Sequence, residues 1–340
     1  MPSRLRLFAA AVLALLLLPS LFLRDRGLRW DHARRLEIVA LSVPHSATRG
    51  LGPFRLAGAW ELRSDDFLFG GYSALIARPG GRLLALSDRN GRLDFHEPPA
   101  SPLPYVMSRI SVDPREVRGI ADAEAATTGP SGDIWVSWED RHMISRIDRD
   151  FTRETRVRPV ELHGWSSQFG AESMVRDGAG RFILVSEDFV PRSYERQHET
   201  LVYASDPTAG AEGLVDPGTV GATRGRLIAR SGYRPTDIAL LPDGRALVLL
   251  RQLRWPLPLR FSGRIALADP AELLRTGTWH ARDLAYLDRP LPSDNYEGLA
   301  VRARPDGRVD VWVISDDNKA STQRTLLLKL LLDPADLPRR

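Results

Sequence analysis

The chain has 340 residues and a mass of 37.9 kDa, and 43% of the residues are hydrophobic while 26% are charged. This balance is that of a folded globular protein and excludes a disordered or fibrous chain. Cysteine is absent from the sequence, which excludes disulfides, zinc–thiolate sites, iron–sulfur clusters and thiol nucleophiles. The net charge is +4, but residues 1–35 alone carry +5, so the remaining body carries −1. A nearly neutral body with scattered Arg argues against nucleic-acid binding.

The start of the chain has the pattern of a targeting segment. Two Arg residues precede an apolar stretch, Leu7–Leu23, as in a secretory signal. The small residues of a cleavage site do not follow, and the stretch is near the lower length of a membrane span. We therefore expect residues 1–24 to be a signal peptide or an uncleaved signal-anchor, followed by a linker over residues 25–50. We expect the body to be exported. It would then be periplasmic, or anchored to the membrane by residues 7–23 and facing the periplasm, or secreted.

Five segments of the body share one pattern. Each is expected to have a polar or acidic residue, a short apolar strand, a turn containing Gly, a second apolar strand and then an acidic end. The segments start 48–65 residues apart and comprise residues 71–90, 122–141, 170–189, 235–254 and 295–318. Two β-rich runs around such a turn predict a β-hairpin, and recurrence at this spacing is typical of repeat architectures.

Two further strands follow most of the hairpins, which gives the four antiparallel strands of a β-propeller blade. The last hairpin is followed by one strand, Thr325–Leu332, and we expect Phe54–Leu62 to complete that blade and close the ring. Helical periodicity is absent from the sequence after residue 36. The sequence therefore predicts an all-β propeller over residues 51–334, with a tail at 335–340. We expect five blades, with room for a sixth in the long third or fourth repeat.

Carboxylates recur in register, where the inner strand of a hairpin begins and where its second strand ends. These two ends lie side by side opposite the turn, so a propeller gathers them on one rim of its central channel. Many carboxylates in one place need a counter-charge, and oxygen ligands without His or Cys clusters favour calcium over magnesium or manganese. The expected metal ligands are Glu124, Glu172, Asp237 and Glu297. The expected catalytic residues, which activate water or complete the metal shell, are Asp88, Glu139, Glu187 and Asp316.

Cationic and amide side chains stand just beyond the same strand ends. Guanidinium groups match phosphate oxygens, so these residues are expected to bind an anionic ester substrate. The expected substrate-binding residues are Arg89, Arg324 and Asn318. Arg251 stands where the other repeats have an acid, which weakens the interpretation of a complete metal ring. The alternative that these acids have no function also stays open. Acids at strand ends are often solvated turn residues, and they recur in each repeat because the repeats are similar in sequence.

Several motifs of the body resemble the phytase-like domain family, often described as "esterase-like activity of phytase" proteins. The motifs are Phe69–Ser73, Leu84–Arg89, Asp294–Leu299, Ser315–Asn318 and Gln323–Thr325. The resemblance spans nearly the whole body and implies an exported propeller with hydrolase activity on phosphate or other esters. It does not supply a catalytic mechanism. The second and third repeats depart from the family, because Ala125 and Ser173 stand where Gly is expected.

We therefore expect a monomeric, calcium-dependent hydrolase that acts on a small anionic ester. Two alternatives stay open: a calcium-bound sugar-lactone hydrolase of the gluconolactonase type, and a non-catalytic envelope propeller that binds a partner. A serine nucleophile is disfavoured, because the sequence lacks a Gly-x-Ser-x-Gly motif.

Overall fold

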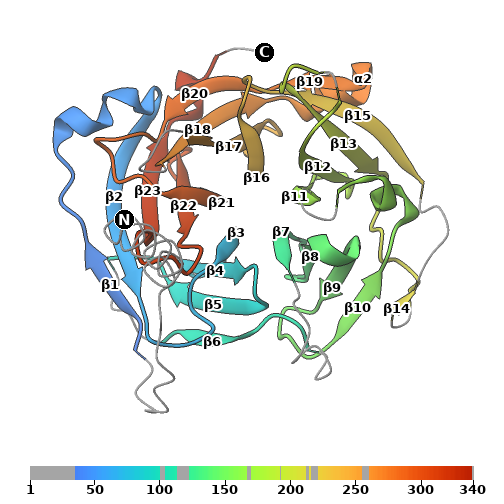
Figure 1. Cartoon of the computed structure of the whole chain (residues 1–340), viewed down its shortest axis with the longest axis horizontal. Coiled ribbons are helices and arrows are strands. Elements are labelled where there is room, and N and C mark those ends of the chain that lie inside the picture. The colour runs from blue at the N-terminus through green and yellow to red at the C-terminus, as the bar shows by residue number, and fades with distance from the viewer. Residues whose placement is uncertain are drawn as a thin grey trace, which may run out of the picture.

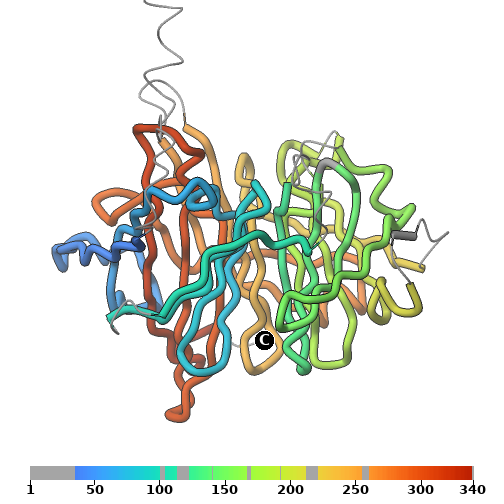
Figure 2. The backbone as a smooth tube through the Cα atoms, turned by 90° about the horizontal axis from the view of Figure 1, so that it is seen from below, coloured from blue at the N-terminus to red at the C-terminus, as the bar shows by residue number. Residues whose placement is uncertain are grey.

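The computed structural model of the protein describes residues 35–99, 104–112, 122–166, 170–191, 193–211, 214–215, 221–254 and 260–338. These residues form five sheets around a common axis, an all-β propeller with five blades (Figure 1). The innermost strand of each sheet faces the axis, and the side view shows the strands running roughly along it (Figure 2). The predicted all-β propeller is confirmed, and the number of blades is five.

Each blade begins with an inner strand and continues outward through the next strands of the chain. Blade 1 consists of β3 (Tyr72–Arg78), β4 (Arg82–Ser87), β5 (Gly91–His96) and β6 (Val106–Arg109). Blade 2 consists of β7 (Ala123–Thr128), β8 (Ile134–Trp138), β9 (Met143–Ile147), β10 (Glu154–Val157) and β14 (Leu214–Val215). Blade 3 consists of β11 (Ala171–Arg176), β12 (Phe182–Phe189), β13 (Gln197–Tyr203), β15 (Ala222–Ile228) and β19 (Thr278–His280).

The last two blades complete the ring. Blade 4 consists of β16 (Arg234–Leu240), β17 (Ala246–Arg254), β18 (Arg260–Ala268) and β20 (Arg282–Tyr286). Blade 5 consists of β21 (Asn295–Ala303), β22 (Val309–Asp316), β23 (Thr325–Leu332), β2 (Phe54–Arg63) and β1 (Glu37–Ala40). The short helices are η1 (His45–Leu51), η3 (Glu139–Arg141), η4 (Val160–Gly164), α2 (Pro270–Thr276) and η5 (Pro334–Asp336).

Blade 5 combines strands from both ends of the described chain. β2 pairs antiparallel with β23, from Phe54 opposite Leu332 to Leu62 opposite Thr325. β1 then adds a fifth strand, which lies in the segment expected as a linker. Among the described residues, no helix has the length and hydropathy needed to cross a bilayer. The expected signal or anchor, residues 1–24, lies outside the described residues.

The hydrophobic core consists of five clusters, each between two neighbouring blades. One cluster, for example, joins Leu247 and Ile265 of blade 4 to Val311 and Leu328 of blade 5. Because both faces of a blade are covered, strands such as β22 are buried at every position instead of alternating. A fully buried Leu contributes about 1.5–3 kcal/mol, so the blade interfaces hold the ring together.

A short helix, α2, lies between β18 and β19 and departs from the all-β pattern. Its seven residues are too few for a clear helical periodicity, which is why the sequence pattern does not predict it. The capping residues do mark it. The side chain of Asp269 accepts a hydrogen bond from the Ala271 N–H at 3.0 Å, Pro270 occupies the first turn, and Gly277 ends the helix at φ 75°.

Gly298 is enclosed by the neighbouring strand of its own blade and by blade 1, which leaves no room for a side chain. A Cβ there would lie 2.6 Å from Ile314 Cγ2 and 3.0 Å from Leu75 Cβ. We expect Gly298→Ala to lower the free energy of unfolding by about 2 kcal/mol, as overpacking does. A Cβ on Gly178 would have no neighbour within 4 Å, so Gly178→Ala is the matched control and should change stability by less than about 0.5 kcal/mol. Urea denaturation of both variants measures this, and equal midpoints would contradict the tight contact.

Candidate functional site

A β-bulge in every inner strand fixes the side chains that begin each hairpin. In each blade one residue of the inner strand has no partner on the second strand: Ser73, Glu124, Glu172, Thr236 and Glu297. A bulge turns a side chain away from the regular alternation of the strand. Three of the four predicted metal ligands therefore occupy equivalent positions in the ring, and the other two bulge positions carry hydroxyl side chains.

An equivalent position on the second strand of each hairpin lies beside the bulge. It is the residue after the partner of the last paired residue before the bulge: Asp88, Glu139, Glu187, Arg251 and Asp316. Strand pairing places Arg251 opposite Arg234 and Asp316 opposite Asn295. The Glu139 N–H likewise donates to the Asp122 carbonyl at 2.9 Å. The four predicted catalytic positions thus lie on one rim, and the fifth position of that rim is an arginine.

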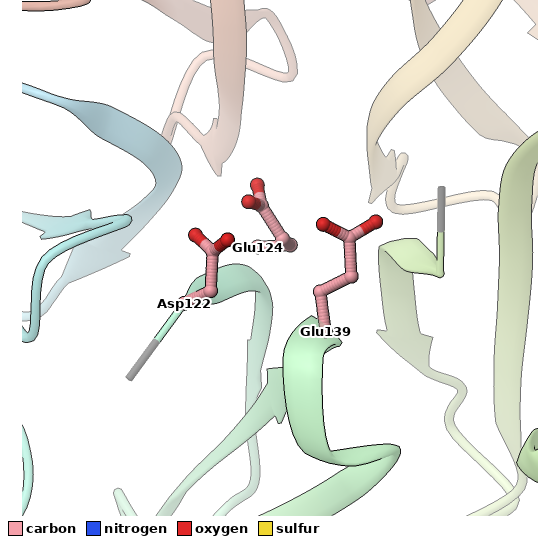
Figure 3. Close-up of side chains that lie close together, drawn as sticks. All are labelled: Asp122, Glu124 and Glu139. Atoms are coloured by element: carbon pink, nitrogen blue, oxygen red, sulfur yellow. The ribbon is translucent and has the colours of Figure 1, made fainter. Parts of the chain in front are cut away.

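Three carboxylates of blade 2 converge near the axis of the propeller. One oxygen each from Asp122, Glu124 and Glu139 lies within 4.8 Å of the other two, and Figure 3 shows the three side chains close together. Asp122 precedes β7, Glu124 is the bulge residue of β7, and Glu139 begins η3. Sequence reasoning assigned no role to Asp122. Its place in the repeat, two residues before the bulge acid and matching Asn295, was the available signal.

Blade 3 adds a fourth carboxylate to this group. Glu172 is buried, and the charge of the nearby Glu139 helps to raise the pKa of its carboxyl group. The Gly170 N–H donates to Glu139 Oε1 at 2.5 Å. A Cβ on Gly170 would lie 2.9 Å from Glu139 Cγ, so only glycine lets the two blades approach this closely. We call Asp122, Glu124, Glu139 and Glu172 the acidic cluster.

Burial raises the pKa of the three glutamates of the acidic cluster, Glu124, Glu139 and Glu172. Burial raises the pKa of Glu139 to about 7, against the opposing effect of the Gly170 hydrogen bond. Burial and then the charge of Glu172 hold the pKa of Glu124 well above its usual range. Among the described residues, Asp122, Glu124 and Glu139 form no ion pair with a Lys or Arg. The negative charge of these three carboxylates can therefore be neutralised only by a proton or a bound cation.

The opposite part of the channel has a counter-charge of its own. The Arg251 guanidinium hydrogen-bonds to both Glu187 and Glu297 and donates to Asn295 Oδ1 at 3.0 Å. Its side chain is only 22% exposed. Arg234 approaches Glu187 Oε2 at 3.5 Å. Burial still raises the pKa of Glu297 to about 7, although the Arg251 charge lowers it. Glu297, a predicted metal ligand, and Glu187, a predicted catalytic residue, are thus engaged by an arginine.

Asp237 lies one residue beyond the ring of bulge positions, because Thr236 occupies the bulge of blade 4. Its Oδ2 accepts a hydrogen bond from the Leu299 N–H at 2.7 Å, and its Oδ1 accepts one from the Ile238 N–H at 2.8 Å. The carboxylate therefore links β16 to β21 of the next blade. The spacing between acids in the sequence does not show that Thr236, and not Asp237, is the bulge residue. A bulge is defined by the pairing of the two strands, which the sequence alone does not give.

The remaining predicted residues differ in exposure and in the groups they contact. Asp88 is partly exposed, 3.8 Å from Arg89, and burial raises its pKa to about 6 while Arg89 opposes the rise. Asp316 is buried and accepts a hydrogen bond from the Asn318 N–H at 2.6 Å. The exposed Asn318 side chain follows this rim. Arg324 faces Glu61 of β2 at 3.9 Å, and β2 is the fourth strand from the axis.

The fold and this rim define a β-propeller protein with acidic side chains gathered around its axis. A sequence model of the phytase-like family, described as "Esterase-like activity of phytase", matches residues 68–319. The chain belongs to this phytase-like family. The match covers all five inner hairpins and confirms the resemblance drawn from the sequence motifs.

Solved structures of other proteins are similar to the chain at low identity. The glutaminyl cyclase of Myxococcus xanthus shares 11% identity over 82% of this chain and 97% of its own, with a TM-score of 0.42. A streptogramin B lyase shares 11% over 87% and 98%, with a TM-score of 0.40. The virginiamycin B lyase of Staphylococcus aureus shares 9% over 88% and 100%, with a TM-score of 0.39. No curated protein sequence matches the chain.

Arg251 should be the most sensitive cation of the channel. Arg251→Gln leaves Glu187 and Glu297 buried without their partner, so we expect a loss of about 3 kcal/mol in unfolding free energy at pH 8. The loss should be smaller at pH 5.5, because the pKa of Glu297 is about 7 and protonation then removes the unpaired charge. Arg234→Gln, which removes a longer contact to Glu187, is the control. Equal, pH-independent losses in the two variants would contradict the role of Arg251.

Proposed function

We propose that the protein is an exported hydrolase of phosphate or other esters that depends on a divalent cation, with calcium as the preferred ion. The observation that carries the proposal is the convergence of Asp122, Glu124 and Glu139 without a cationic partner among the described residues. Family membership supports the ester-hydrolase class through the family's description. The basic and apolar start of the chain, residues 1–24, supports export.

The donor set fits calcium. Calcium takes six to eight oxygen ligands from carboxylates, carbonyls and water in a flexible geometry. The three converging carboxylates offer oxygens from one blade, and Glu172 offers more from the next. These residues replace the set expected from the sequence, since Glu297 is engaged by Arg251 and Asp237 by backbone amides.

The neighbouring side chains suit ester hydrolysis. A cation bound by these carboxylates would polarise an ester oxygen and lower the pKa of a water molecule. Asp88 follows β4 of the adjacent blade 1. Its pKa is about 6, so its carboxylate can accept a proton near neutral pH. Arg89 is 52% exposed beside it and can bind an anionic oxygen of the substrate. We propose a small anionic ester as substrate and a monomeric protein.

Calcium and protons should compete for the acidic cluster. Glu139 binds its proton more tightly in the folded chain, so this stabilisation is present below its ordinary pKa of 4.5 and is lost as the pH rises through about 7. We therefore expect the melting temperature in EDTA to fall between pH 5.5 and pH 8. Calcium should raise the melting temperature more at pH 8 than at pH 5.5, because metal ligands must be deprotonated.

A matched pair of variants makes this thermal-shift measurement specific. Glu124→Gln/Glu139→Gln should abolish the calcium shift, whereas Asp150→Asn should keep it, because Asp150 is a surface acid that is 70% exposed. A calcium shift of equal size in both variants would place the ion elsewhere and contradict the proposed site.

A substrate panel tests the reaction class. We expect the full chain to hydrolyse phosphate monoesters in calcium and to lose activity at least about a hundredfold in Glu139→Gln, while Asp150→Asn retains it. Hydrolysis of sugar lactones but not of phosphate esters would overturn the phosphate preference and favour the lactone class. Calcium binding without turnover on any ester would overturn the hydrolase assignment and leave a binding propeller.

A further inference from the structure

A second candidate site lies between blades 2 and 3, at the end of the blades opposite the acidic cluster. The turns that join β7 to β8 and β11 to β12 border a cavity of about 380 Å³. Its apolar lining includes Trp135, Ala179 and Ala204, and Ser131 and Ser205 bring hydroxyl groups. Two arginines also line it, Arg146 and Arg176.

Arginines at this end of the propeller are paired with carboxylates almost throughout. Arg82 lies 2.7 Å from Asp94, Arg245 lies 2.7 Å from Asp243, and Arg308 lies 2.5 Å from Asp306. Such short pairs within one hairpin neutralise the turn. An arginine without a carboxylate partner is therefore unusual at this end of the propeller.

Arg146 is paired in this way. It contacts Asp133 at 2.5 Å and Asp206 at 3.2 Å. Asp206 also accepts hydrogen bonds from Trp135 Nε1 at 2.8 Å and from the Thr208 hydroxyl at 2.7 Å. The carboxylate of the cavity is therefore engaged by Arg146, Trp135 and Thr208.

Arg176 differs from these arginines. Among the described residues, its guanidinium forms neither an ion pair nor a hydrogen bond, although the side chain is half-buried. The neighbouring acid, Asp177, is held by Arg181 at 2.6 Å. A Cβ on Gly180 would lie 3.2 Å from Arg176 Nη2, so the glycine turn leaves the guanidinium its space in the cavity.

We propose that this cavity binds a small organic anion through Arg176. A phosphate or carboxylate head group would accept charge-assisted hydrogen bonds from the guanidinium, with the hydroxyls of Ser131 and Ser205 within the same lining. A compact apolar body would rest on the wall that includes Trp135. The cavity volume suits such a ligand, since small-molecule sites span about 300–1,000 Å³. This site is separate from the acidic cluster and does not depend on the proposed hydrolase activity.

Calorimetric titration of the full chain with phenylphosphonate, and separately with benzoate, tests the site. Neither probe has an ester bond, and EDTA in the buffer removes cations from the channel. We expect saturable binding of one or both probes, and the tighter probe identifies the head group. Arg176→Ala should weaken binding at least about tenfold, the effect of losing a charge-assisted hydrogen bond. Arg153→Ala, at a 90% exposed arginine of blade 2, should change it less than about twofold.

Two results would overturn the proposal. One is the absence of saturable binding of both probes at concentrations of about 10 mM, a range that detects even weak sites. The other is unchanged affinity in Arg176→Ala. Should that variant fail to fold, Arg176→Lys decides, because it keeps the charge but loses the bidentate geometry. Affinity for phenylphosphonate equal to wild type in Arg176→Lys would then also count against the site.

Discussion

Carboxylates of like charge cannot share a buried channel unless protons or cations neutralise them, and this constraint shapes the centre of the propeller. Five equivalent bulges and the five equivalent positions beside them bring acids together at one rim. The acids of this rim fall into two groups that differ in their counter-charge. Arg251 pairs with Glu187 and Glu297, whereas Asp122, Glu124 and Glu139 pair with no Lys or Arg among the described residues. The proposed calcium site follows from this asymmetry.

The repeat pattern predicted most of the fold, because each blade of a propeller repeats the same pattern of strands and turns along the sequence. Each hairpin carries its own turn, and the apolar strands are continuous because neighbouring blades cover both of their faces. Short features without periodicity escaped this reasoning. Helix α2 has only seven residues, and β14 and β19 are two- and three-residue strands that pair in parallel with strands of the preceding blade. Such pairings depend on tertiary approach and leave no local pattern.

The candidate site was predictable to the level of the rim but not of the single residue. Counting from acid to acid placed Glu124 and Glu172 at equivalent positions, because both are bulge residues. The same counting selected Asp237, whose neighbour Thr236 is the bulge residue of blade 4. Asp122 was overlooked, because its contribution arises from proximity to Glu124 and Glu139 in space. Charge pairing across blades, such as that of Arg251 with Glu297, likewise requires the closed ring.

The central claim is that the acidic cluster is a divalent-cation site. Anomalous diffraction from crystals of the full chain soaked in manganese tests it most directly, because the ion locates itself independently of any activity. We expect one strong peak within coordination distance of Asp122, Glu124 and Glu139, and its loss in Glu124→Gln/Glu139→Gln. A channel without a peak, with manganese found only at surface carboxylates, would contradict the claim.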